Sequence, residues 1–464
     1  MLETEVYGLV SGPAWWRKSF LEVLLDLGYR INPYDRCVLT LDSEDRSADA
    51  PTEGILLIEV DDVLESGGEV HQRKMKALQE RLRFGKAVEL RAEASGTAYA
   101  GRRIKQLEDY SFSYSMDDYV ENRLRPVTLT RKTLMKDAKQ TILNAEEEAQ
   151  LRGTIASLNW VAREGRPDAA AAASILAGSF PQPTVQDVLD ANKAVQRIKS
   201  HRVTLRIHSI AEEKVRHFVI ADSSFDPTGR SKPQHGWLQG ITDSRLNQGS
   251  EAPISLLAWK SRRLRRKAGN TMLCESISLS TALGALERQI AMWNSFRLSR
   301  FDPRQQAESD DHRGRRGAPT VIASDDPGFT DPLSVAIIDA KSLFDAAATE
   351  QSSGDCDRSA LEVAIIQDSI ARCRGRVRWV PHNFNPSDAL TKVAGAHEKP
   401  MMDLLRTSRL KIQAEEQTLA EGRQHEHRMK TKVNPKDFQG ADSTFNSVVL
   451  TSESSDCRVF SNRP

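Results

Sequence analysis

The sequence predicts a mixed α/β (α+β) protein in which helices pack on mixed β-sheets, followed by a polar segment. Short apolar runs typical of buried strands alternate along the chain with longer stretches of helical periodicity. Between residues 217 and 393 the predicted order is three strands, a helix, a strand, helices, a strand and a helix, which is typical of helices layered on one sheet. After residue 412 apolar side chains thin out and Glu, Gln, Lys, Ser and Asn dominate, so we expect disorder there.

The composition restricts the size class and excludes several kinds of protein. A chain of 464 residues corresponds to about three domains. The 65 Lys and Arg residues against 64 Asp and Glu residues give a net charge of +1, which excludes a uniformly basic nucleic-acid wrapper but leaves room for a local basic site. No apolar run approaches the roughly 18 residues of a membrane span, so we expect no membrane partner. The five cysteines are scattered without a CxxC pair, which indicates free thiols rather than a zinc site or a disulfide framework.

Changes in pattern divide the chain into four predicted regions, 1–125, 126–210, 211–395 and 396–464. The first alternates helix-like and strand-like patterns, the second is helix-rich, the third carries the layered pattern, and the fourth is a polar, mostly disordered tail. Within the third region, residues 297–332 are rich in Arg, Asp, Gly and Pro and are predicted to form an exposed, flexible insertion.

Specific elements follow from the apolar spacing. A helix is predicted to end at Gly28, a buried strand over Gly54–Val60, and helices over 132–161, 168–178 and 184–199. The elements expected in the third region are strands over 217–222, 236–241, 254–259, 335–339 and 376–380 and helices over 274–293, 359–373 and 387–393.

Four acids of the third region occupy positions that can converge. Asp222 and Asp339 each end an apolar strand, while Glu275 and Asp388 each lie near the start of a helix. Crowded carboxylates repel one another unless cations neutralise them, and oxygen ligands favour Mg²⁺ or Mn²⁺. Two such ions can hold the attacking and leaving oxygens of a phosphodiester displacement. The alternative for each acid taken alone is a cap on the following turn or helix.

A basic segment lies between the third predicted strand and Glu275. It could hold a nucleic-acid backbone beside the carboxylates, and the alternatives are a solvated loop or a localisation signal. Its cationic residues are Lys260, Arg262, Arg263, Arg265, Arg266 and Lys267.

Six short segments of the third region follow one another in the order of a known family. They are Ala221-Asp222, Trp259-Lys260-Ser261, Cys274-Glu275-Ser276, Ile338-Asp339-Ala340-Lys341-Ser342, Val380-Pro381 and Ser387-Asp388-Ala389-Leu390-Thr391-Lys392. In this order they resemble the RNase H domain of Pol polyproteins from copia-type LTR retrotransposons. The resemblance implies that the four acids bind two Mg²⁺ or Mn²⁺ ions and that the substrate is the RNA strand of an RNA–DNA hybrid. His382 does not clearly match the loop histidine of some RNase H enzymes, so we expect an ordinary strand-end residue.

The upstream part resembles the C-terminal portion of the same family's reverse transcriptase. The matching segments are Tyr7-Gly8-Leu9 with Pro13 and Trp15-Trp16, Leu25-Asp26-Leu27-Gly28-Tyr29, Val60-Asp61-Asp62, Asn159-Trp160-Val161 and Arg166-Pro167-Asp168. The resemblance implies a truncated palm over 1–125, a helical thumb or connection over 126–210, and Asp61 and Asp62 as polymerase carboxylates. The family's first polymerase Asp precedes the segment at which this chain begins, and Glu59 replaces a usual aromatic residue, so we expect an inactive polymerase half. The alternative for Asp61 and Asp62 is an ordinary hairpin turn.

Three hypotheses about function remain open at this point. The first is an RNase H-type endonuclease fused to a truncated reverse transcriptase, which would work beside other Pol or Gag products in a cytoplasmic particle or in the nucleus. The second is a catalytically dead remnant that acts at most as a nucleic-acid-binding module. The third is an unrelated two-metal nuclease or integrase-like enzyme, for which cleavage of duplex DNA would be diagnostic.

Overall fold

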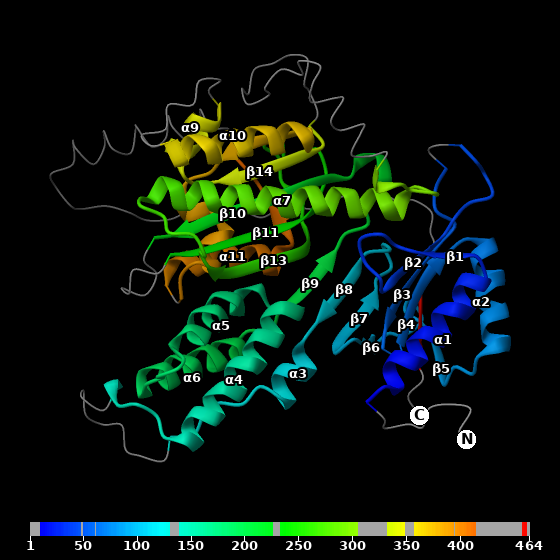
Figure 1. Ribbon diagram of the computed structural model, residues 1–464, viewed down its shortest axis with the longest axis horizontal. Coiled ribbons are helices and arrows are strands. Elements are labelled where there is room, and N and C mark those ends of the chain that lie inside the picture. The colour runs from blue at the N-terminus through cyan, green and yellow to red at the C-terminus, as the bar shows by residue number, and fades with distance from the viewer. Residues whose placement is uncertain are drawn as a thin grey trace, which may run out of the picture. The chain divides into compact units, whose positions relative to one another are not determined.

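The computed structural model describes residues 10–47, 50–60, 62–129, 139–225, 233–304, 332–348, 357–393, 395–413 and 457–461. The chain forms two compact units, which are treated separately below (Figure 1). Unit 1 comprises Met1–Ile207, Gly284–Pro319 and Ser455–Pro464, and unit 2 comprises His208–Leu283 and Thr320–Ser454. The fold is a mixture of helices and sheets, as predicted. Among the described residues, no helix combines the length and the apolar character needed to cross a membrane.

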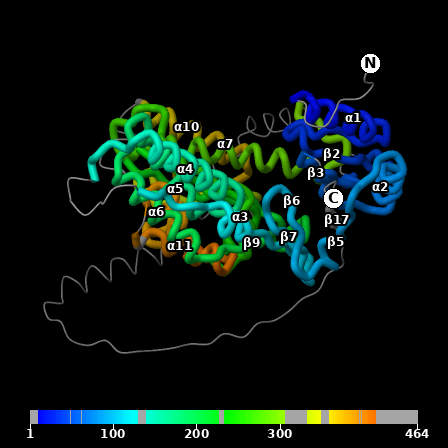
Figure 2. The backbone as a smooth tube through the Cα atoms, turned by 90° about the horizontal axis from the view of Figure 1, so that it is seen from below, coloured from blue at the N-terminus to red at the C-terminus, as the bar shows by residue number. Residues whose placement is uncertain are grey.

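Unit 1 begins with a six-stranded sheet covered by two helices. The strand order is β1-β2-β3-β4-β17-β5, and the C-terminal strand β17 pairs antiparallel with both β4 and β5 (Figure 2). Side chains of β3 alternate between buried and less buried, so the sheet presents one apolar face to a core that includes Phe20 and Leu24 of α1 and Met75 of α2. The elements are α1 (Gly12–Asp26), β1 (Tyr29–Ile31), β2 (Val38–Leu41), β3 (Gly54–Glu59), β4 (Asp62–Gly67), α2 (Glu69–Arg81), β5 (Lys86–Glu89) and β17 (Cys457–Ser461).

A buried polar network fixes α2 on this sheet. Both ring nitrogens of His71 form hydrogen bonds. Nδ1 lies 2.9 Å from the Tyr29 hydroxyl, and Nε2 lies 2.7 Å from Glu65 Oε2. The space for the imidazole exists because Gly54 and Gly67 have no side chain: a Cβ on either would lie 2.1 or 2.5 Å from the ring. The network therefore depends on two glycines that face each other in strands β3 and β4.

The remainder of unit 1 combines a four-stranded antiparallel sheet, in the order β6-β7-β8-β9, with four helices. Helix α4 begins at a capping box in which Asn144 and Glu147 bond each other's backbone, which satisfies amide groups that lack helical partners. Arg166 is fully buried and binds both carboxylate oxygens of Asp168, at 2.9 and 2.8 Å. The elements are β6 (Thr97–Tyr99), β7 (Arg102–Gln106), β8 (Phe112–Ser115), α3 (Asp117–Asn122), α4 (Ala145–Glu164), α5 (Ala170–Leu176), α6 (Val185–Ser200) and β9 (Thr204–Ile207).

Unit 2 is built on a five-stranded mixed sheet with the order β13-β11-β10-β14-β15. Strand β11 is antiparallel to its two neighbours β10 and β13, and β14 and β15 run parallel to β10. Nearly every residue of β10, β11 and β14 is buried, as in a sheet covered on both faces. The strands are β10 (Arg216–Ser224), β11 (Gln234–Thr242), β13 (Ser255–Arg263), β14 (Ser334–Ile338) and β15 (Gly375–Trp379).

Helices and short 3₁₀ turns complete unit 2 in the predicted order (Figure 1). Helix α7 begins in unit 2 and continues into unit 1, while the small strands β12 and β16 pair with each other. The elements are β12 (Ala252–Pro253), α7 (Thr271–Arg297), α9 (Lys341–Ala348), α10 (Asp357–Arg372), η5 (His382–Phe384), η6 (Pro386–Leu390), α11 (Lys399–Thr407) and β16 (Arg409–Leu410).

Several boundaries differ from the sequence prediction. The helix predicted over 132–161 begins at Ala145, after the Asn144 cap, and the short helix predicted over 387–393 is the 3₁₀ turn η6. The third strand of unit 2 continues through Arg263, because its basic residues pair with β11. Ordered elements lie within the range 396–464 that was predicted as a mostly disordered tail: α11 buries Met401, Leu404 and Leu405, and β17 lies in a sheet. Within the predicted insertion 297–332, Leu298 forms a β-bridge with Pro51, and residues 305–331 lie outside the described residues, as do 414–456 of the tail.

We predict that two buried histidines destabilise unit 2 in mild acid. Burial lowers the pKa of His217 and of His235 from 6.5 to about 4, with help from Arg216 for the first and from Arg262 and Lys260 for the second. Between about pH 6.5 and 4 these two residues therefore bind protons in the unfolded chain but not in the folded chain, so their contribution to the free energy of unfolding falls as pH falls through this window. Each histidine contributes on the order of 2–3 kcal/mol to that loss. The raised pKa values of the buried acids Asp222 and Glu275 act in the opposite direction over the same range.

Urea unfolding between pH 4.5 and 7 measures this effect. From pH 7 to 4.5 the stability of His217→Gln should rise relative to that of the native chain, whereas His201→Gln, at an exposed position, should follow the native chain. An equal slope in all three proteins would contradict the prediction.

Candidate metal centre

Asp222, Glu275 and Asp339 come from three separate elements and meet at one end of the unit 2 sheet. Asp222 lies near the end of the central strand β10, Glu275 near the N-terminal end of α7, and Asp339 directly after β14. One carboxylate oxygen from each lies within 4.8 Å of one from each of the others. Both Asp222 and Glu275 are buried, with 2% and 8% of their surface exposed. The structure therefore brings together three of the four acids predicted to bind metal.

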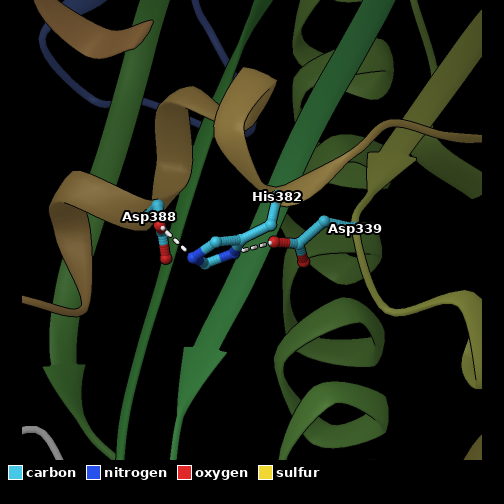
Figure 3. A group of neighbouring side chains, drawn as sticks. All are labelled: Asp339, His382 and Asp388. Atoms are coloured by element: carbon cyan, nitrogen blue, oxygen red, sulfur yellow. Dashed lines mark hydrogen bonds and ion pairs between the residues drawn. The ribbon is translucent and has the colours of Figure 1, made fainter. Parts of the chain in front are cut away.

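The fourth acid, Asp388, joins Asp339 through His382 (Figure 3). His382 Nδ1 lies 2.8 Å from Asp339 Oδ2, and Nε2 lies 3.0 Å from Asp388 Oδ2. Asp388 is buried in η6, whereas most of the His382 side chain is exposed. All four predicted acids thus belong to two groups of three that share Asp339.

The position of η6 depends on Gly236 of β11, which lies opposite Asp222 in the sheet. A Cβ on Gly236 would lie 2.3 Å from the Leu390 Cβ, so only glycine lets η6 approach this closely. Ser261, opposite Gly236 on β13, donates a hydrogen bond to the Leu390 carbonyl. Thr391 then donates a hydrogen bond to Asp222 Oδ2. These contacts hold Asp388 and Asp222 on the same face of the sheet.

The electrostatics of the group follow from burial and mutual repulsion. Burial raises the pKa of Asp222 well above its usual range, and the charges of Glu275, Asp339 and Asp388 raise it further. Burial and then Asp339 raise the pKa of Glu275 to about 8, against hydrogen bonds from Ser223 and the charge of Lys392. Without a cation the group therefore holds protons near neutral pH.

Lys392 supplies a positive charge to this group. Its ammonium forms an ion pair with Asp388 Oδ1, four residues earlier in the chain. No donor among the described residues is aligned for a hydrogen bond to Asp388 Oδ2, although His382 Nε2 is close. A buried carboxylate oxygen without a hydrogen bond, beside three further acids, is what a bound cation would satisfy. These acidic groups could hold a metal ion.

The six predicted nucleic-acid-binding cations do not form one surface. Lys260, Arg262 and Arg263 belong to strand β13 and not to a loop, and successive side chains of a strand point to opposite faces. Arg263 therefore shares the face of Asp222, while Lys260 and Arg262 lie on the other. Arg265 and Lys267 are exposed in the following segment, and Arg266 forms an ion pair with Glu362 of α10.

Asp62, one of the two predicted polymerase acids, is not part of this group. It opens β4 in unit 1 and pairs with Glu59 of β3, and Val60 after Glu59 has φ of 54°. Asp61 lies outside the described residues. The pairing of Glu59 with Asp62 is that of a tight β-hairpin. Tyr99 lies near this hairpin: its burial, and then the negative charges of Glu59 and Asp62, raise its pKa.

The sequence analysis did not identify several residues of the centre. His382 was expected to be an ordinary strand-end residue, and Lys392, Thr391 and Gly236 were given no role of their own in the centre. The spacing of Lys392 four residues after Asp388 was an available signal, because such pairs lie side by side in helical turns. The bridging position of His382 depends on contacts between elements and had no such signal.

Comparison with known proteins adds no relative. Neither the known protein-family models nor the curated proteins include a match to this chain.

We predict that Mg²⁺ stabilises the protein at this centre. Asp222→Asn should raise the melting temperature of the EDTA-treated protein by roughly 2–4 °C, because the side chain no longer has to take up a proton to be buried beside the other acids. The same change should abolish the additional stabilisation that Mg²⁺ gives to the native chain. That stabilisation should be larger at pH 8 than at pH 6, because Glu275, with a pKa of about 8, must lose its proton to bind a cation.

Thermal denaturation with and without Mg²⁺ measures both effects. Asp345→Asn is the matched control, since Asp345 is an exposed acid of α9 paired with Lys341. An identical Mg²⁺ response in Asp222→Asn and the native chain would exclude metal binding at this centre.

We also predict that Gly236→Ala displaces η6. The added methyl group overlaps Leu390, so the variant should lose roughly 1–3 kcal/mol of stability and should bind Mg²⁺ more weakly. Gly284→Ala is the control, because no atom lies within 4 Å of a Cβ at that helical position. It should leave Mg²⁺ binding unchanged and stabilise the helix by about 0.5–1 kcal/mol. Calorimetry of both variants distinguishes a displaced η6 from a general effect of replacing glycine.

Proposed function

We propose that unit 2 is an RNase H-type nuclease that hydrolyses the RNA strand of RNA–DNA hybrids with two metal ions. The observation that carries the proposal is the convergence of Asp222, Glu275, Asp339 and Asp388 from four separate elements at one end of the β13-β11-β10-β14-β15 sheet. The unit combines a mixed sheet with flanking helices, which is the architecture that the resemblance to an RNase H domain implies. The collinear sequence segments support the same assignment.

The chain's own residues have separable tasks in this proposal. The metals would be held by four acids: Asp222 and Asp388, which η6 keeps on one face of the sheet, together with Glu275 and Asp339. We propose Mg²⁺ because carboxylate oxygens are the ligands that it prefers. Bound divalent ions would acidify the attacking water and stabilise the leaving oxygen. Thr391 orients the Asp222 carboxylate through its hydroxyl. His382 holds the Asp339 carboxylate on the exposed side of the centre.

Specificity for hybrid RNA would come from the 2′-hydroxyl and the groove shape and not from base sequence. Arg263, on the Asp222 face of the sheet, and the exposed Arg265 and Lys267 would contact phosphates. The resemblance upstream supports a reverse transcriptase portion in unit 1, which we propose is inactive because Glu59, opposite Asp62 in the hairpin, replaces the family's usual aromatic residue with a negative charge.

A catalytically dead remnant that binds nucleic acid is the second candidate. One observation favours it: Lys392 and His382 already pair with Asp388 and Asp339, so the charge that a metal would neutralise is partly neutralised by the chain. In this case the centre would be a structural ion-pair network.

Cleavage of an end-labelled RNA–DNA hybrid tests the proposal. The native chain with Mg²⁺ should cut only the RNA strand, and Asp222→Asn should reduce the rate by on the order of 100-fold or more. Asp345→Asn should cut like the native chain. Cutting of duplex DNA instead would favour an unrelated two-metal nuclease. If the folded protein cuts nothing with either Mg²⁺ or Mn²⁺, the catalytically dead remnant becomes the favoured hypothesis.

A further inference from the structure

Exposed apolar side chains lie close in sequence to residues of the metal centre. Among the described residues of unit 2, six large apolar side chains are exposed, and three of them are close in sequence to residues of the centre. We call these three the apolar rim: Phe225, Phe384 and Val393, which are 42%, 53% and 40% exposed. Phe225 follows Asp222 by three positions, Phe384 follows His382 by two, and Val393 follows Lys392 directly.

The chain keeps the rim close to the carboxylates. Each residue of extended chain spans at most about 3.6 Å, so the backbones of the rim lie within roughly 11 Å of those of their site neighbours. These neighbours are themselves joined: His382 contacts Asp339 and Asp388, and its Nε2 lies 3.5 Å from Lys392 Nζ. The rim therefore flanks one continuous charged centre and is not scattered over the unit.

Exposure of these side chains calls for a partner with both a charged and an apolar part. A phenylalanine half exposed to water is unfavourable unless another surface covers it, and scattered single cases need no explanation, but three around one charged centre do. A nucleotide has this dual character, because its phosphate is anionic while its sugar carbons are apolar. In a paired hybrid the base faces are stacked on one another, so the apolar surface that a side chain can reach is that of the sugars and base edges along the groove.

We propose that the apolar rim packs against the sugars and base edges on either side of the phosphate held at the metal centre. This inference rests on the proposed function and adds the residues that seat the substrate. Phe384 is the main contact, because it is the most exposed of the three and its 3₁₀ turn begins at His382. The rim acts on substrate binding and takes no part in the chemical step.

Kinetics and binding of alanine variants test the rim. Phe384→Ala and Phe225→Ala should each raise KM for a labelled hybrid about fivefold to tenfold while kcat stays within about twofold, and Phe384→Tyr should restore KM. Leu361→Ala and Ile365→Ala are matched controls, since these residues of α10 are 63% and 41% exposed and flank no acid of the centre. Anisotropy of the hybrid with Asp222→Asn, alone and combined with Phe384→Ala, measures binding independently of cleavage.

The outcomes separate the rim from the proposed function. If the native chain cleaves the hybrid and the rim variants match the α10 controls in KM and binding, the rim proposal is overturned and the nuclease remains. If the native chain does not cleave but Phe384→Ala weakens hybrid binding fivefold or more, the nuclease is excluded and the rim stands as a nucleic-acid contact. Absence of both cleavage and binding overturns both proposals.

Discussion

Repulsion between buried carboxylates is the constraint on which unit 2 depends. Bringing Asp222, Glu275 and Asp339 within a few ångströms of one another in a buried place opposes folding, and the raised pKa values of Asp222 and Glu275 record that opposition. The surrounding sheet must therefore be stable enough to hold them. The continuous burial of β10, β11 and β14 supplies that stability, because apolar side chains cover both faces of the central strands.

Local contacts then determine how the repulsion is relieved. Thr391 satisfies one Asp222 oxygen, Lys392 pairs with Asp388, and His382 bridges Asp388 and Asp339. All three come from the segment that follows β15, so one short piece of chain supplies both an acid and the groups that compensate it. Its close approach requires the bare backbone of Gly236. A centre of this kind is sensitive to small shifts of one 3₁₀ turn.

The parts of this arrangement that local pattern encodes were predictable. Apolar runs ending at Asp222 and Asp339 identified two strands of the sheet, and Glu275 was placed at the start of a long helix, as observed. The bridging of His382, the Leu390–Gly236 approach and the extension of β13 through Arg263 were not predictable, because they depend on partners far away in sequence. From sequence alone, the run of Arg and Lys residues in that strand is typical of a loop, and only its pairing with β11 shows that it is part of the sheet.

The pairing of β17 has a consequence for the order in which the protein forms. Strands β4 and β5 do not pair with each other in the six-stranded sheet, because residues 457–461 lie between them. Translation from Glu89 to Cys457 takes about 20 to 70 s at ordinary ribosome speeds. The edges of β4 and β5 that pair with β17 therefore have unpaired amide and carbonyl groups until residues 457–461 are synthesised. During synthesis, the first sheet of the chain to appear is the last to be completed.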